Sequence, residues 1–183
     1  MLEIRRADAG DAFALSLLGS ATMLETYADN VPGPDIVTHC ANKHSAAVYA
    51  HWLADPAVAI WTVRTPTQAA IGYLVMTPAT LPSAAPHPDD LEVQRIYVLS
   101  RFHGLGLGHR LMNHAVAEAG ARSGRQLVLG VLKVNARAVA FYQRQGFVHI
   151  DTRSFQVGAS IFDDYVLGRP LRDTIVEQHA KSR

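Results

Sequence analysis

Residues 95–112 read RIYVLSRFHGLGLGHRLM, and this stretch decides how the rest of the chain is interpreted. It begins within an alternating β-rich run that starts at Leu91, and it ends in an amphipathic helical pattern. Between the two, Gly104, Gly106 and Gly108 occupy alternate positions. Such glycines let the backbone approach a ligand, and the first amides of the next helix lie at its positive dipole end. The stretch predicts a strand, a pyrophosphate-binding turn and a helix, although a plain strand-to-helix turn is the alternative.

Other phosphate-binding motifs fit this turn poorly. No Lys-Ser/Thr pair follows the glycines, so the turn is not a nucleotide P-loop. The spacing is GxGxG rather than GxGxxG, and the turn lies in mid-chain, after several predicted strands rather than one. A dinucleotide-binding fold is therefore not expected.

The flanking sequence alternates between strand and helix patterns, which predicts an α/β fold. Proline breaks the chain at Pro32 and Pro34, and three further prolines mark residues 81–90 as a loop. Strands are expected over residues 2–6, 58–64, 69–77, 91–99, 127–132, 147–155 and 161–167. Helices are expected from a cap at Asp8 or Asp11 to Ala21, over residues 35–41 and 45–53, from Leu107 to about Ala119, and over residues 135–145.

Composition bounds the class of protein. The chain has 183 residues, of which 49% are hydrophobic and 18% charged, as in a globular protein, and we expect one domain over residues 1–183. No apolar run is long enough to span a membrane, and the N-terminus lacks an apolar signal core, so we expect a soluble cytoplasmic protein without a membrane partner. A net charge of +1 argues against binding to nucleic acid.

The single cysteine and the histidines suggest no further chemistry. Cys40 excludes an internal disulfide, and it is either a nucleophile or, as we expect, a small buried residue. The nine histidines show no metal-ligand spacing, so we expect no metal site.

Charge is distributed unevenly along the chain. Residues 1–99 hold 5 Lys/Arg and 10 Asp/Glu, whereas residues 100–183 hold 12 and 6. This asymmetry suits a cationic ligand on one side and an anionic ligand on the other, with chance as the alternative. Glu25 and Asp29, just before Pro32, either attract a cationic acceptor or are solvated charges at a helix end.

The glycine turn resembles the acetyl-coenzyme A motif of the GCN5-related N-acetyltransferase (GNAT) superfamily. The matching residues are His103-x-x-Gly106-x-Gly108, preceded by Ile96-Tyr97-Val98. The family usually has Gln or Arg where this chain has His103, and only a protonated histidine adds positive charge. We therefore expect the affinity for the cofactor to depend on pH near neutrality.

A second motif resembles the same superfamily. Residues 135–147 match N-x-x-A-x-x-F-Y-x-x-x-G-F, from Asn135 through Tyr142 to Gly146 and Phe147, in the family's order and at about its spacing. The resemblance covers residues 69–167 and implies a twisted, mixed, mostly antiparallel sheet of six to seven strands flanked by about four helices. It implies acetyl-CoA binding by Ile96, Tyr97, Val98, His103, Gly104, Leu105, Gly106, Leu107, Gly108, Asn135 and Tyr142.

The resemblance also implies catalytic roles. Tyr142 would protonate the leaving thiolate, with simple packing as its alternative role. Asn135 lies two helical turns before Tyr142 and would cap the helix or bind the pantetheine arm. An amine must be neutral to attack a thioester, so a base is needed. Glu92, eleven residues before His103, is the candidate, acting directly or through water, and Asp90 is the reserve.

Alternation along the strand places Glu92 and Gln94 on the same face as Ile96 and Val98. Attack would be direct, in a ternary complex, with a strand amide polarising the thioester carbonyl.

One branch resembles the chain more closely, the bacterial spermidine/spermine acetyltransferases of the Pai type. The resemblance includes residues 90–98, Leu129-Gly-Val131 and Arg153-Ser-Phe155, but Gln94 stands where that branch often has a second glutamate. We therefore expect a small-molecule primary amine as acceptor, with polyamines as one class. A peptide N-terminal acetyltransferase and a non-catalytic acyl-CoA-binding regulator are the alternatives. A homodimer through sheet edges is conceivable.

Overall fold

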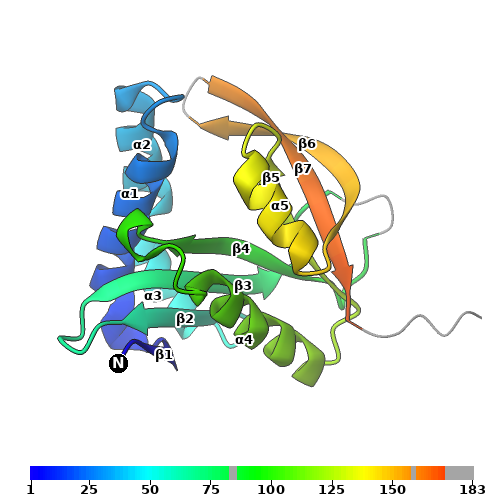
Figure 1. Ribbon diagram of the computed structural model, residues 1–183, viewed down its shortest axis with the longest axis horizontal. Coiled ribbons are helices and arrows are strands. Elements are labelled where there is room, and N and C mark those ends of the chain that lie inside the picture. Colours follow the sequence, from blue (N-terminus) through cyan, green and yellow to red (C-terminus); the bar gives the residue numbers. More distant parts are fainter. Residues whose placement is uncertain (83–85, 158–159, 172–183) are drawn as a thin grey trace, which may run out of the picture.

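The computed structural model describes residues 1–82, 86–157 and 160–171, and a seven-stranded sheet forms its centre, in the order β1-β2-β3-β4-β5-β7-β6 (Figure 1). The strands are β1 (Glu3–Arg6), β2 (Ala59–Arg64), β3 (Ala70–Pro78), β4 (Leu91–Val98), β5 (Gln126–Leu132), β6 (Val148–Val157) and β7 (Ser160–Pro170). Neighbouring strands pair antiparallel except β4 and β5, which pair parallel. The predicted mixed, mostly antiparallel sheet is confirmed. Residues 83–85 of the predicted proline-rich loop lie outside the described residues.

Helices cover both faces of the sheet. They are α1 (Ala12–Tyr27), α2 (Gly33–Lys43), α3 (Ala46–Ala54), α4 (Leu107–Ala121) and α5 (Ala136–Arg144). On one face, Leu15 and Leu18 of α1 and Tyr49 of α3 pack with Tyr73 and Val75 of β3. On the other face, the apolar stripe of α4 packs on β2 to β5. Every residue of β2 is buried, because helices cover the strand on both sides.

The first long helix extends further than its sequence predicts. Helix α1 runs to Tyr27, not to Ala21, because no proline or glycine stops it before Pro32. Two threonine hydroxyls in its last turns donate to carbonyls one turn earlier, Thr22 to Leu18 and Thr26 to Thr22. This extension brings the end of α1 to the site described below.

A bulge interrupts strand β4 and changes which side chains share a face. Val93 pairs with Met76 and Arg95 pairs with Val75, which leaves Gln94 as the extra residue. Val93, Ile96 and Val98 therefore all pack on the α4 side. The predicted sharing of a face by Glu92, Gln94, Ile96 and Val98 is wrong, because the bulge moves Glu92 to the opposite face.

Strands β4 and β5 separate at the middle of the sheet. Their pairing consists of Leu91 with Leu127 and Glu92 with Val128, and beyond these residues the two strands, which are described over their full lengths, are not paired. The backbone of β4 from Val93 onward therefore lacks a neighbouring strand on the β5 side. This opening in the sheet is where the chemical site is built.

Candidate active site

The glycine turn leads from β4 into α4 and has the geometry of an anion cradle. Gly104 and Gly106 have φ angles of 83° and 70°, and a Cβ atom at either position would meet nothing within 4 Å. The first intrahelical bond runs from the Arg110 amide to the Gly106 carbonyl at 3.0 Å, so the amides before it have no intrahelical acceptor. The first turn of α4 contains no acidic residue. The turn thus fits a pyrophosphate, with room above the glycines and positive potential at the helix start.

His103 lies at the mouth of this turn with one ring nitrogen engaged. Its Nε2 lies 2.7 Å from the Val98 carbonyl oxygen, which only accepts, so Nε2 carries the proton and donates. Nδ1 then remains for a ligand. It donates to a phosphate oxygen only when the imidazole is doubly protonated, which is the physical basis of the pH dependence expected above.

Glu25 at the end of α1 holds the start of the same turn. Its two carboxylate oxygens accept hydrogen bonds from the Ser100 amide at 3.1 Å and the Ser100 hydroxyl at 3.0 Å. The expectation that Glu25 attracts a cationic acceptor is therefore not supported by its position. Its carboxylate instead anchors the turn to α1.

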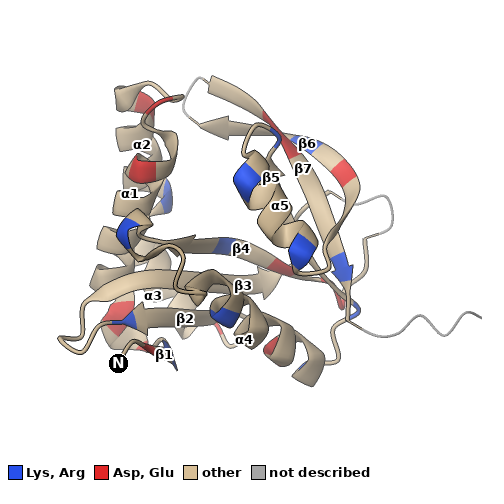
Figure 2. Cartoon of the chain, viewed as in Figure 1, with Lys and Arg blue, Asp and Glu red and all other residues tan. Residues whose placement is uncertain are grey.

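The two sequence motifs meet in space. A Cβ atom on Gly108 would lie 3.4 Å from Cζ of Phe141, so α4 and α5 are in close contact there. One residue further, Nδ1 of His109 lies 2.9 Å from Oε1 of Gln145. Helix α5 carries Arg137 and Arg144 and no acidic residue, which suits an anionic ligand nearby (Figure 2). The glycine turn and the helix that carries Tyr142 thus lie next to each other.

Asn135 caps the helix that carries Tyr142. Its side-chain Oδ1 accepts a hydrogen bond from the backbone amide of Ala138 at 3.0 Å, and its backbone amide donates to the Leu132 carbonyl. Of the two roles considered for Asn135, the structure shows capping. The side-chain nitrogen is the group that remains for a pantetheine arm.

Tyr142 is buried between the two motifs. Its ring contacts Phe141 and Phe147 edge-on, at centroid distances of 5.2 and 6.0 Å. Burial raises the pKa of the Tyr142 hydroxyl, and the neighbouring Tyr97 phenol raises it further. The hydroxyl therefore keeps its proton at neutral pH and is a donor at this position.

Glu92 is buried at the point where β4 and β5 separate. Its Oε2 accepts three hydrogen bonds, from the amide and hydroxyl of Thr80 at 2.8 and 3.0 Å and from the Leu81 amide at 3.2 Å. These donors fix the carboxylate in place and occupy one oxygen. Any proton transfer to Glu92 therefore favours its other oxygen or an intervening water.

Asp90, the reserve base, has a structural role at the end of β4. Arg125 donates to both of its carboxylate oxygens, and Gln126 donates to Oδ2 at 2.9 Å. Burial acts to raise the pKa of Asp90, but these hydrogen bonds and the charge of Arg125 outweigh it and lower that pKa. An ion-paired carboxylate of this kind is a poor base.

A group of polar residues on the face opposite α4 was missed by the sequence reasoning. The Tyr97 ring stacks on that of Tyr73 at a centroid distance of 6.0 Å, and the phenols of Tyr97 and Tyr27, at the end of α1, influence each other's pKa. Asp164 of β7 influences the pKa of both Tyr27 and Tyr97. Asp164 could have been found from the alternation along β7, because it is a charged residue on the same strand face as the apolar Phe162 and Val166.

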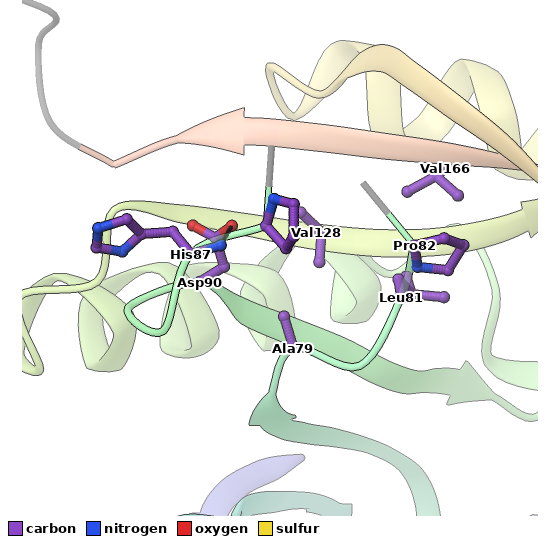
Figure 3. Close-up of a pocket in the computed structure, with 8 residues that line it drawn as sticks. Ala79, Leu81, Pro82, His87, Asp90, Val128 and Val166 are labelled. Carbon is purple, nitrogen blue, oxygen red and sulfur yellow. Dashed lines mark hydrogen bonds between the residues drawn. The ribbon is translucent and has the colours of Figure 1, made fainter. Parts of the chain in front are cut away.

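A small cavity lies beside the residues that hold Glu92. It has a volume of about 30 Å³, and its lining includes Ala79, Leu81, His87, Asp90 and Val128 (Figure 3). This is room for about one water molecule. None of the lining residues comes from the glycine turn or from α5.

Three further findings concern metals, membranes and the cysteine. Across residues 1–82, 86–157 and 160–171, no three histidine, cysteine or carboxylate side chains are grouped so that they could hold a metal ion. None of the helices in the described part of the chain is long and apolar enough to cross a membrane. Cys40 is half-buried and packs beside Ile36 and Val31.

Comparison with known proteins identifies the family. Residues 22–147 match the model of the acetyltransferase (GNAT) family. An uncharacterised N-acetyltransferase of Mycobacterium tuberculosis is 34% identical over 127 residues, which cover 69% of this chain and 76% of that protein. An uncharacterised N-acetyltransferase of Lactobacillus delbrueckii is 30% identical over 100 residues, 55% of this chain and 58% of that protein.

Solved structures share the fold. The PaiA N-acetyltransferase of Thermoplasma acidophilum, solved with coenzyme A, has a TM-score of 0.75 at 16% identity and covers 93% of this chain and 99% of its own. The ribosomal-protein-S18-alanine N-acetyltransferase of Escherichia coli has a TM-score of 0.70 at 16% identity, covering 98% and 100%.

The fold and the paired motifs thus define an acetyltransferase. The chain belongs to the acetyltransferase (GNAT) family. It is accordingly an N-acetyltransferase that uses acetyl-CoA as the acetyl donor, as its two motifs predict.

Proposed function

We propose that the chain transfers the acetyl group of acetyl-CoA to a primary amine of a small molecule, by direct attack in a ternary complex. Polyamines are the first acceptor class to test. The observation that carries the proposal is the separation of β4 from β5 after Glu92 and Val128, together with a buried Tyr142 that packs in the same core as these two strands. This arrangement gives an extended ligand a free strand edge and gives a leaving sulfur a proton donor.

Each residue then has a distinct part. Acetyl-CoA would supply the activated acetyl group as a thioester. Gly104, Gly106 and the first amides of α4 would hold its pyrophosphate, and an amide of β4 would stabilise negative charge at the carbonyl oxygen. The Tyr142 hydroxyl would donate its proton to the departing sulfur.

Glu92 is the proposed base and would accept a proton that the amine must lose. Because Thr80 and Leu81 occupy Oε2, we favour transfer through a water molecule over direct contact. The Glu92 carboxylate lies on the face of the sheet opposite α4. The acceptor amine would therefore approach from that face, away from the glycine turn.

Two alternatives remain distinct. A peptide N-terminal acetyltransferase has the same fold, as the Escherichia coli structure illustrates, so the fold does not separate the two substrate classes. A non-catalytic acyl-CoA-binding regulator would bind acetyl-CoA and release no thiol with any amine. A cytoplasmic location, a single domain and a homodimer stay predictions from the sequence.

The decisive experiment measures thiol release from acetyl-CoA over a panel of amines and short peptides. We expect turnover with small amines, and at least tenfold slower turnover in Tyr142→Phe and in Glu92→Gln with nearly unchanged cofactor affinity. Tyr165→Phe is the matched control, because it removes the hydroxyl of a partly buried tyrosine of β7. Its turnover should stay near that of wild type. Peptide turnover alone would favour the peptide enzyme, and full activity in both variants would remove the catalytic assignments.

A further inference from the structure

Asp164 is a carboxylate in a place where the sheet otherwise buries apolar groups. It lies on β7, two residues from Phe162 and from Val166, and pairs with Leu132 of β5 and Arg153 of β6. Its side chain is 4% exposed. A charged group is rarely buried to this extent unless it is paired or used.

Arg153 binds one of the two oxygens of this carboxylate, Oδ2. Its Nε and Nη2 both lie 3.2 Å from Oδ2 of Asp164. The guanidinium reaches across β7 as far as Gly130 of β5, where a Cβ atom would lie 2.8 Å from Nη2. Gly130 therefore provides the space that lets Arg153 hold Asp164 from one side.

The other oxygen of Asp164 is left without a partner. Oδ1 is buried, and no hydrogen-bond donor reaches it among the residues that the structure describes. An unsatisfied buried acceptor is costly, and more so when it is charged. The other unpartnered buried atoms are two threonine hydroxyls and Nε of Arg64, so Asp164 is the carboxylate among them.

The surroundings of Oδ1 are those of the acceptor side of the sheet. Burial raises the pKa of Tyr27, Tyr97 and Tyr142; the charge of Asp164 adds to this rise for Tyr27 and Tyr97, and Tyr97 adds to it for Tyr142. Met23 and Tyr27 of α1 and Ile36 of α2 pack over the partly buried Phe155 and Phe162. Burial raises the pKa of Asp164, although the charge of Arg153 opposes the rise. A positive partner at Oδ1 would relieve this cost.

We propose that Oδ1 of Asp164 receives the nitrogen of the acceptor amine. This inference rests on the proposed function and deepens it, because it names the acceptor-binding group. The fixed Oδ2–Arg153 contact leaves one carboxylate oxygen for one nitrogen. Asp164 thus offers a place for one amine nitrogen.

The test measures binding of the acceptor apart from turnover. Titration calorimetry of n-butylamine and of spermidine into the protein saturated with coenzyme A would be run on wild type, Asp164→Asn and Asp163→Asn. Asp163 is the matched control, because it carries the same charge one residue away, is 68% exposed and faces Lys133. We expect at least tenfold weaker amine binding in Asp164→Asn, no more than twofold change in Asp163→Asn, and unchanged coenzyme A affinity in both.

The outcomes separate the two proposals. Equal amine affinity in wild type and a folded Asp164→Asn overturns the role of Asp164, whatever the turnover assay shows. Absence of thiol release from every amine, with amine binding lost in Asp164→Asn, overturns the proposed function and leaves the binding site standing. If Asp164→Asn does not fold, Asp164→Ser replaces it, since it removes the carboxylate and keeps a small polar group. Unchanged amine affinity in Asp164→Ser then overturns the inference.

Discussion

Nδ1 of His44 lies 3.0 Å from the hydroxyl oxygen of Tyr49, in a buried contact beneath α1. Burial, the largest cause, acts together with the positive charge of Arg95 and the nearby ring of His39 to lower the pKa of His44 from 6.5 to about 3. The folded protein therefore keeps this imidazole neutral over a pH range in which an unfolded chain would protonate it.

The pKa shift of His44 predicts acid sensitivity. Between pH 6.5 and 3 the unfolded state binds one more proton than the folded state, so the free energy of unfolding falls as pH falls. The contribution of the neutral His44 to the free energy of unfolding is fully present above pH 6.5, and below that pH it decreases by about 1.4 kcal/mol per pH unit. Urea unfolding from pH 7 to pH 4 should show a steeper loss in wild type than in His44→Asn. His51→Asn, an exposed histidine of α3, should follow wild type; parallel curves for all three proteins would contradict the prediction.

Gly19 of α1 is predicted not to tolerate a methyl group. A Cβ atom there would lie 2.3 Å from both Nδ1 of His44 and the hydroxyl of Tyr49, and Arg95 holds that hydroxyl at 2.8 Å. Glycine to alanine inside a helix usually stabilises by about 1 kcal/mol, but overpacking costs about 1–3 kcal/mol. We expect Gly19→Ala to lower the melting temperature by several degrees. Gly120→Ala in α4, where the space is open, should raise it or leave it unchanged in the same thermal scan.

Several features of the site follow from local sequence, and others do not. The glycine turn, the stripe of α4 and the Asn135 cap each depend on residues close together in the chain, so their patterns predict them. The Gln94 bulge depends on how β3 pairs with β4, and a register shift leaves no mark on alternation in one strand. The Asp164–Arg153 pair and the Glu25–Ser100 contact join residues from different elements, so a single sequence offers only an oddly placed charge as a clue.

Gly106 is predicted to matter for cofactor affinity rather than for folding alone. Its φ of 70° is unfavourable for a residue with a side chain, by about 1–2 kcal/mol, and its Cβ would occupy the space above the turn. We expect Gly106→Ala to weaken coenzyme A binding by about tenfold, which is about 1.4 kcal/mol, in titration calorimetry. Gly33→Ala at the start of α2, also with open space but without a positive φ, serves as the control. Equal affinities in the two variants would argue that the turn does not bind the cofactor.

His103 should make coenzyme A binding depend on pH. With Nε2–H donated to Val98, only the doubly protonated ring offers Nδ1–H and a positive charge to a phosphate. Affinity measured from pH 8 down to pH 5.5 should therefore increase in wild type. In His103→Arg, whose charge is constant over this range, it should be higher at pH 8 and nearly flat, apart from titration of the phosphates themselves. His109→Arg, a histidine of α4 bonded to Gln145, controls for added charge near the turn and should keep the wild-type slope. A dissociation constant that stays flat in wild type over the whole range would remove His103 from the phosphate site.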